Sequence, residues 1–398
     1  RAVAVEITQR YGHHASFGGL AIQMTTNGYT QLPGDSAGID HQTRARFVHD
    51  VTDGNPPPTP VDPTTSPWRE RWKIWRCRQL ASLYLGMQED LQREVQKINQ
   101  FSSPQLYLCP ADLLYHPHII SQLRPRLPQS GSLPGALQGL GIHPAFLSSQ
   151  PGMTWLEPSL TAPVVNIQHQ ATQLVMQGPL QPAADPAFPV QAGVQFFHAP
   201  QVRQLADFDS RHMPATRNAK TLLVATIPAA GNAARRHIVQ ALAKRDVPVL
   251  VNGGWTLPLG QEAATRQLFQ TFSQLPAGPF QEGPSSQPVL VRQMRRATGS
   301  FVYLLNTAPW PVEATLTITL PGSSLPGPLD GRAGSRFQRH GQEIQWKVEL
   351  EPYDLHAARL SSPRFSIDDL KISFDQHVRR DLQREIHDVN YLANLLDQ

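Results

Sequence analysis

Short apolar runs that alternate with helical segments are the feature that most restricts how this chain can fold. The strand-like runs are continuously apolar and occupy residues 19–24, 105–111, 153–157, 220–227 and 247–252. Strands that alternate with helices at this spacing form βαβ units around a parallel sheet. Unbroken apolarity is typical of strands that are covered on both faces. The sequence therefore predicts an α/β fold in its larger part.

The pattern changes at about residue 279, where short β-branched runs with alternating polarity begin. These runs predict a small antiparallel β-sandwich of roughly 80 residues. A helix follows from about residue 375, with an apolar stripe at Val378, Leu382, Ile386, Val389 and Leu395. We expect this stripe to pack on its own domain, with a coiled coil as the alternative. The expected domains are 1–277 (barrel), 278–363 (β-sandwich) and 364–398 (C-terminal amphipathic helix).

Composition and motifs exclude several classes of protein. The net charge of +4 over 398 residues comes from scattered basic side chains, so no nucleic-acid partner is expected. No apolar run reaches the roughly 18 residues that a membrane span needs. Cys77 and Cys109 lie outside any CxxC pair and are expected as buried thiols, with a disulfide as the alternative. Because nucleotide-binding, serine-hydrolase and zincin motifs are also missing, we expect no cofactor and no metal.

Several long stretches carry a resemblance to a known family. They include QRYGHHASFGGLAIQMTTNGYTQLPG, WRCRQLASLYLGMQEDL, LYLCPADLL, FFHAPQVRQLADFDS, VNGGWTLPLGQEAATRQLFQTFSQLP and LEPYDLHAARLSSP, which span most of residues 6–363. Together they resemble the bacterial family-10-like glycoside hydrolases, the glycosyl hydrolase-like 10 group. The resemblance implies a (β/α)8 TIM-barrel-like domain followed by a β-sandwich, and a carbohydrate substrate.

The resemblance also implies that the N-terminal barrel strands are missing from this chain. The five strands counted above fall short of the eight that close a barrel. We therefore expect an N-terminal remainder of the same polypeptide. We also expect poor solubility of residues 1–398 alone, because open sheet edges invite association. An extracytoplasmic or secreted location is favoured over a cytoplasmic one.

Two carboxylates lie where barrel chemistry is usually placed, at the carboxyl ends of strands. Asp112 follows LYLCPA and Glu157 follows MTWL. Glycoside hydrolysis commonly needs one protonated and one charged carboxyl group across the scissile bond, so these two are the candidate catalytic residues. The alternatives are that Asp112 caps a helix beginning at Leu113 and that Glu157 pairs with an arginine.

The stretch RYGHHASFGGLAIQ resembles the lead-in to the fourth strand of many retaining barrel glycosidases. In those enzymes the strand usually ends in Asn-Glu, whose Glu is the acid/base. The corresponding positions here are near Met24 and Thr25, so this strand carries no such acid.

Polar and aromatic side chains near the strand ends suit carbohydrate, because a sugar ring packs well on an indole. The candidate binding residues are Asn27, Tyr29, Trp68, His198, Asn252 and Trp255. Trp72 and Trp75, which follow Trp68 at helical spacing, are expected as core residues.

The sequence thus leads to one main hypothesis, a glycoside hydrolase that acts on an oligo- or polysaccharide by carboxylate acid/base catalysis. The alternative is a non-catalytic carbohydrate-binding or cell-surface scaffold protein that kept the barrel. A third hypothesis is that the sandwich and the terminal helix form an interaction module for assembly.

Overall fold

The computed structural model divides the chain into two compact units, which are described separately. It describes residues 1–14, 16–26, 28–35, 37–55, 61–98, 103–113, 118–119, 133–160, 193–197, 202–205, 222–225, 229–252, 262–329, 331 and 335–396. The first unit comprises Arg1–Thr226 and Val249–Leu257, and the second comprises Ile227–Pro248 and Pro258–Gln398.

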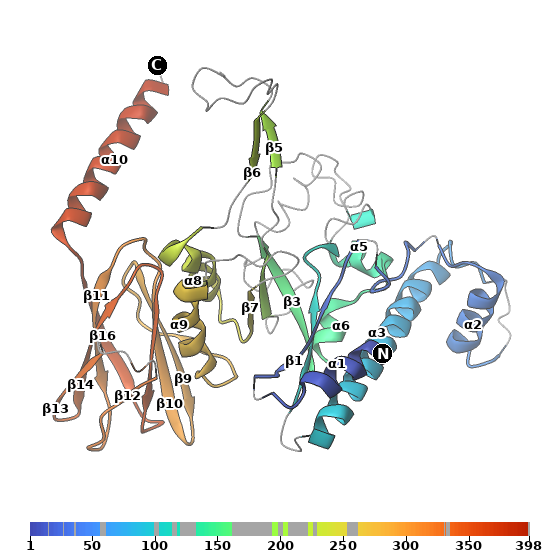
Figure 1. Cartoon of the computed structure of the whole chain (residues 1–398), viewed down its shortest axis with the longest axis horizontal. Coiled ribbons are helices and arrows are strands. Elements are labelled where there is room, and N and C mark those ends of the chain that lie inside the picture. Colours follow the sequence, from blue (N-terminus) through green and yellow to red (C-terminus); the bar gives the residue numbers. More distant parts are fainter. Residues whose placement is uncertain are drawn as a thin grey trace. The chain divides into compact units, whose positions relative to one another are not determined.

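The first unit is built on a parallel five-stranded sheet (Figure 1). Its strands are β1 (Gly19–Gln23), β2 (Gln105–Cys109), β3 (Met153–Leu160), β4 (Gly193–Phe197) and β7 (Leu250–Asn252). They are hydrogen-bonded in the order β1-β2-β3-β4-β7, so neighbours in the sheet are successive parallel strands. This arrangement is a curled half-barrel with helices, and it confirms the predicted barrel-like α/β class.

The fourth strand of this sheet is not the predicted one. We expected residues 220–227, but Gly193–Phe197 takes the place between β3 and β7. Instead, β6 (Leu222–Ala225) pairs antiparallel with β5 (Val202–Leu205) in a separate two-stranded sheet. Both segments are short apolar runs, and apolarity alone does not say which partner a strand will choose.

Helix α3 (Trp68–Ile98) covers one face of the sheet in the first unit. Its side chains Leu80, Tyr84 and Leu91 form one buried cluster with Leu106 and Leu108 of β2. The other helices of this unit are α1 (Ala2–Tyr11), α2 (His41–Val51), α5 (Leu133–Gly139) and α6 (Pro144–Ser148). None of the described helices is long and apolar enough to cross a membrane.

A separate aromatic cluster holds α2 against the start of α3. The rings of Trp72 and Trp75 are stacked with centroids 5.2 Å apart, and Phe47 meets Trp72 edge-on at 5.1 Å. The Trp72 indole donates a hydrogen bond to the carbonyl oxygen of Asp35 (3.2 Å). Both indoles are buried, as expected for core residues.

We expect Trp72→Ala to lower the free energy of unfolding by about 3 to 5 kcal/mol, the usual cost of removing a buried aromatic side chain. Urea unfolding would measure this loss. Ile74→Ala is the control, because Ile74 lies on the same helix and is half exposed. Equal effects of the two substitutions would contradict the core role of Trp72.

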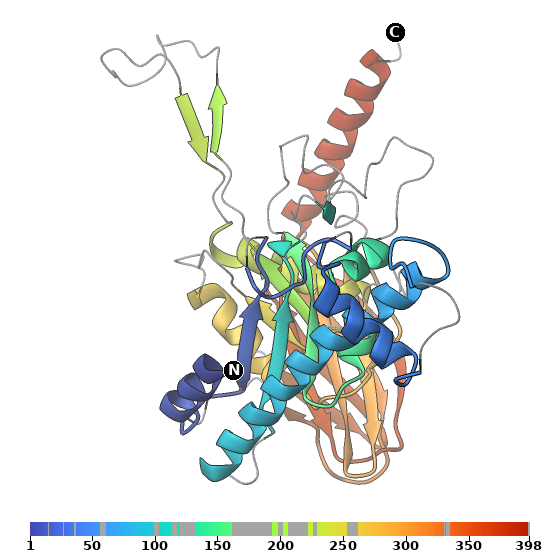
Figure 2. The same ribbon diagram turned by 90° about the vertical axis from the view of Figure 1, so that its right-hand side faces the viewer.

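The second unit is built on two antiparallel sheets (Figure 2). One sheet has the order β12-β15-β10-β9-β8 and the other β13-β14-β11-β16. The strands are β8 (Gln281–Glu282), β9 (Val289–Arg296), β10 (Gly299–Asn306), β11 (Val312–Thr319), β12 (Gly327–Pro328), β13 (Arg336–His340), β14 (Glu343–Leu350), β15 (Leu355–Leu360) and β16 (Ser366–Ser373). Side chains of both sheets share one buried core, in which Val302 and Leu360 meet Leu316 and Trp346.

Strand β16 extends the second sheet past residue 363, where we expected the sandwich to end. It pairs with β11, and the register shifts between Thr317 and Ile318, which face Asp369 and Ile367. Asp368 is the extra residue of this β-bulge. Because of the bulge, the core residues Ile367 and Leu370 are separated by an odd number of positions in the sequence. The strand therefore lacks the strict alternation of apolar and polar residues that would reveal it.

The second unit also contains helices from the segment predicted as barrel. A 3₁₀ turn η4 (Gly231–Arg235) leads into α8 (Arg236–Lys244), and α9 (Glu262–Ser273) follows later in the chain. Arg235 lies within 3.3 Å of Asp354, just before β15, and its Nε donates to the carbonyl oxygen of Ala264 (2.6 Å). This buried ion pair therefore joins η4 and α9 to the sandwich.

Candidate functional site

The concave face of the half-barrel is defined by a hydrogen bond between two glutamines. Gln195 of β4 donates through Nε2 to Oε1 of Gln23 of β1, at 3.2 Å. Strands β1 and β4 are three positions apart, which in a flat sheet separates them by roughly 14 Å. Their side chains meet because the sheet curls, so Gln23 and Gln195 lie on its inner face.

Strand alternation assigns further residues to this inner face. Gln23 is paired in register with Cys109, and Gln195 with Pro158, so each pair shares a face. Burial raises the pKa of the Cys109 thiol to about 12, so it stays protonated at neutral pH. The inner face is thus polar at its glutamines and uncharged at its cysteine.

The side-chain amide nitrogen of Gln23 is able to donate hydrogen bonds to a further group. Its Nε2 is buried and has no hydrogen-bond partner in the described part of the chain. A buried donor without an acceptor costs about 1 to 3 kcal/mol, so such groups usually meet a water or a ligand.

The predicted catalytic carboxylates come from the neighbouring strands β2 and β3 but lie in different environments. Glu157 is only 1% exposed. It shares a strand face with Met153 and Trp155, which belong to the cluster that packs on α3. Alternation therefore places Glu157 on the helix-covered face of the sheet, away from the glutamine pair.

Asp112 lies three residues after Cys109, the last residue of β2, in a turn where it is partly exposed. It makes no hydrogen bond with any described residue that would mark it as a helix cap. Its catalytic role and that of Glu157 stay predictions.

The predicted binding residues are scattered by the structure. Tyr29 is fully exposed, and Asn252 is exposed at the end of β7. Trp68 is half-buried, with Phe47 edge-on at 6.4 Å and the Arg71 guanidinium 5.1 Å from its ring centroid. Asn27, His198 and Trp255 lie outside the described residues.

Gln23 and Gln195 were not predicted from the sequence, although a signal was present. Each is the one polar side chain of its strand: Gln23 is the last residue of GLAIQ, and Gln195 is the middle residue of GVQFF. The predicted site residues lie at strand ends, in loops or at the start of a helix, so amides inside strands were not among them. Groups of three or more potential metal ligands are also missing from the described residues.

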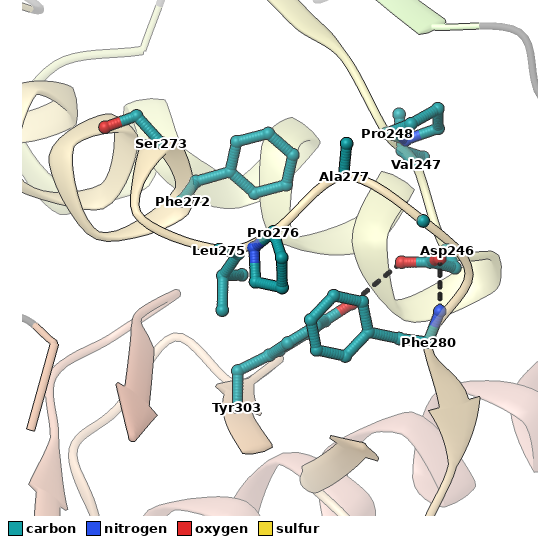
Figure 3. Close-up of a pocket in the computed structure, with 11 residues that line it drawn as sticks. Asp246, Val247, Pro248, Phe272, Ser273, Leu275, Pro276, Ala277, Phe280 and Tyr303 are labelled. Atoms are coloured by element: carbon teal, nitrogen blue, oxygen red, sulfur yellow. Dashed lines mark hydrogen bonds between the residues drawn. The ribbon is translucent and has the colours of Figure 1, made fainter. Parts of the chain in front are cut away.

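A pocket of about 150 Å³ lies within the second unit (Figure 3). Asp246 is at its edge, where its carboxylate accepts a hydrogen bond from the backbone N–H of Phe280 (2.7 Å) and lies 3.5 Å from the Tyr303 hydroxyl. Burial raises the pKa of Asp246, and these donors and the charge of Arg292 oppose that rise only in part.

The raised pKa of Asp246 predicts a pH dependence. In the unfolded chain this carboxyl titrates near pH 3.9; in the folded chain it holds its proton to a higher pH. Its contribution to stability is therefore full below the unfolded value and is lost as pH rises through the folded pKa. Urea unfolding at pH 4 and pH 7 should show Asp246→Asn gaining stability relative to the parent as pH rises. The exposed Asp369→Asn is the control, and equal pH trends for both variants would contradict the assignment.

Comparisons with known proteins give structural likenesses only. No family model matches the chain, and no curated protein matches it. A family 30 endoxylanase from Clostridium papyrosolvens is similar over 90% of this chain and 92% of its own, at 8% identity and a TM-score of 0.33. A family 30 subfamily 8 xylanase from Clostridium acetobutylicum is similar over 71% and 61%, at 7% identity and 0.30. An α-amylase from H. orenii is similar over 69% and 64%, at 8% identity and 0.25. The chain thus has a distant structural similarity to glycoside hydrolases, which concerns the fold alone.

Proposed function

We propose that the inner face of the half-barrel binds carbohydrate. The observation that carries this proposal is the Gln23–Gln195 pair. In this pair the buried Nε2 of Gln23 is available to a hydrogen-bond acceptor. Sugar hydroxyls accept and donate hydrogen bonds at one atom, and amide side chains offer both functions as well. A neutral amide pair suits a neutral hydroxylated ligand better than a charged one.

Binding of a panel of α- and β-linked oligosaccharides, measured by calorimetry on the whole chain, tests this proposal. Gln23→Leu removes the donor and should weaken binding by about 1 to 3 kcal/mol, or roughly five- to 150-fold. Gln42→Leu, an exposed glutamine on α2, is the matched control and should bind normally. Binding that is equal in both variants, or missing in the parent, would refute the proposal.

Glycoside hydrolysis is the second candidate function, in keeping with the family-10-like resemblance. It is supported by the position of Asp112, a partly exposed carboxylate just after β2. The buried position of Glu157 does not favour it as the second carboxylate, since the pair must flank a substrate. Chromogenic glycosides distinguish the two functions: hydrolysis that is lost in Asp112→Asn supports catalysis, and binding without turnover supports the scaffold alternative.

A further inference from the structure

Helix α10 (Gln376–Leu396) presents an uncovered apolar row. It begins after β16 (Figure 1), where the Asp375 carboxylate accepts a hydrogen bond from the backbone N–H of His377 (2.7 Å). Val378, Leu382, Ile386 and Val389 follow one another at spacings of four and three residues, so they form one row along the helix. Ile386 is 61% exposed and Val389 is 64% exposed. The packing on its own domain that we expected for this stripe therefore does not occur at these two residues.

A row of carboxylates runs beside the apolar row. Asp381, Glu385 and Asp388 are also spaced by four and three residues, one position before Leu382, Ile386 and Val389. Their side chains form no ion pair with any residue that the structure describes. Arg379 and Arg380 lie elsewhere on the circumference, since one residue corresponds to a rotation of about 100°. Arg384 lies beside the acidic row, three residues after Asp381 and four before Asp388, but it pairs with neither in the described structure.

The combination of apolar and acidic side chains continues from the base of α10 into the sandwich. A groove of about 420 Å³ is lined there by apolar side chains, among them Phe374 and Val378, and by the carboxylates Glu313, Glu349 and Asp375. Glu313 of β11 and Glu349 of β14 are direct cross-strand partners. Like charges at such positions are unfavourable unless a cation lies nearby, and neither glutamate has an ion-pair partner among the described residues.

We propose that α10 and the groove at its base form a docking surface for a basic amphipathic helix of a partner protein. The apolar row of α10 supplies the buried area, and the acidic row with Glu313 and Glu349 selects lysines and arginines beside the partner's own apolar row. This inference does not depend on carbohydrate binding.

The charge pattern argues against two other occupants. Over Gln376–Tyr391, three arginines balance Asp381, Glu385 and Asp388, so the segment lacks the net positive charge that draws a helix to an anionic membrane. A second copy packed antiparallel would bring acidic row against acidic row, because equivalent flanks meet in that arrangement. A partner helix with a basic flank avoids both problems.

Two synthetic helical peptides as long as α10 test the proposal on the whole chain. Both carry leucines at alternating spacings of three and four residues; one has lysines and the other glutamates beside the leucine row. Fluorescence anisotropy at low salt should show about tenfold or greater preference for the lysine peptide, and this preference should weaken with added salt. Ile386→Ser/Val389→Ser should abolish binding of both peptides.

Charge reversal provides the decisive variant. Asp381→Lys/Glu385→Lys/Asp388→Lys should invert the preference toward the glutamate peptide. The control Gln383→Lys/His387→Lys/Asn390→Lys has the same spacing on the opposite side of the helix and should leave the preference for lysine in place. The proposal is overturned if neither peptide binds, if both bind equally, if the reversal changes nothing, or if light scattering shows that α10 instead joins two copies of the chain.

Discussion

Gly19→Ala is expected to prevent β1 from pairing with β2 and so to unfold the edge of the half-barrel. Gly19 has φ +147°, a backbone conformation that alanine rarely adopts. A Cβ at this position would lie 1.9 Å from the carbonyl oxygen of Gln105 and 2.7 Å from its nitrogen. Because these are backbone atoms of the paired strand, no side-chain rotation can relieve the clash. We expect a loss of more than about 4 kcal/mol in the free energy of unfolding, in the range that marks severe local disruption.

The adjacent Gly18 is a close control for this prediction. A Cβ at Gly18 meets nothing within 4 Å, so Gly18→Ala should change stability little. Circular dichroism during urea unfolding gives the size of both effects. Hydrogen exchange at the backbone amides of Ile22 and Met24 then shows whether β1 has opened. Protection that is retained in Gly19→Ala would mean that this register is wrong.

Removing the carboxylate of Asp354 should have the largest effect in the second unit. Asp354 is fully buried; its Oδ1 lies 3.3 Å from Arg235 and its Oδ2 lies 3.3 Å from Nε2 of His356. It also accepts hydrogen bonds from the backbone N–H groups of Glu351 and Leu355. In Asp354→Ala the Arg235 guanidinium would stay buried without this counter-charge, which costs about 3 to 5 kcal/mol.

An exposed pair of the same unit is the matched control for Asp354. Asp369 lies 3.6 Å from Lys371, and its side chain is 52% exposed. Exposed ion pairs contribute about 1 kcal/mol or less, so Asp369→Ala should shift the urea midpoint only slightly. If the two alanine variants were equally stable, the buried cluster would not be what joins η4 to β15.

The fold was predictable where one periodicity dominated the sequence. The apolar runs of β1, β2 and β3 were all found, because burial on both faces of a strand leaves a direct pattern of continuous apolar residues. The apolar pattern did not distinguish β4 from β6, because both are short apolar runs and only one of them pairs between β3 and β7. It failed again at β16, where the bulge at Asp368 breaks the alternation.

The candidate site was less predictable than the fold. Strand-end position singled out Asp112 and Glu157, but the face to which Glu157 points depends on where the strand begins and on its register. The Gln23–Gln195 contact joins residues 172 positions apart and exists because the sheet is curved. Curvature is a property of the assembled strands, so no local spacing in the sequence reveals it.

The order in which the two units use the chain has a practical consequence. The polypeptide passes from the first unit to the second at Ile227, returns at Val249 and leaves again at Pro258. A single cut therefore cannot release either unit whole. Cleavage just before the sandwich would remove η4, α8 and α9 from it and would separate the buried Arg235 from its ion-pair partner Asp354. Limited proteolysis of the native chain should accordingly yield nicked fragments that remain associated through purification and separate only in denaturant.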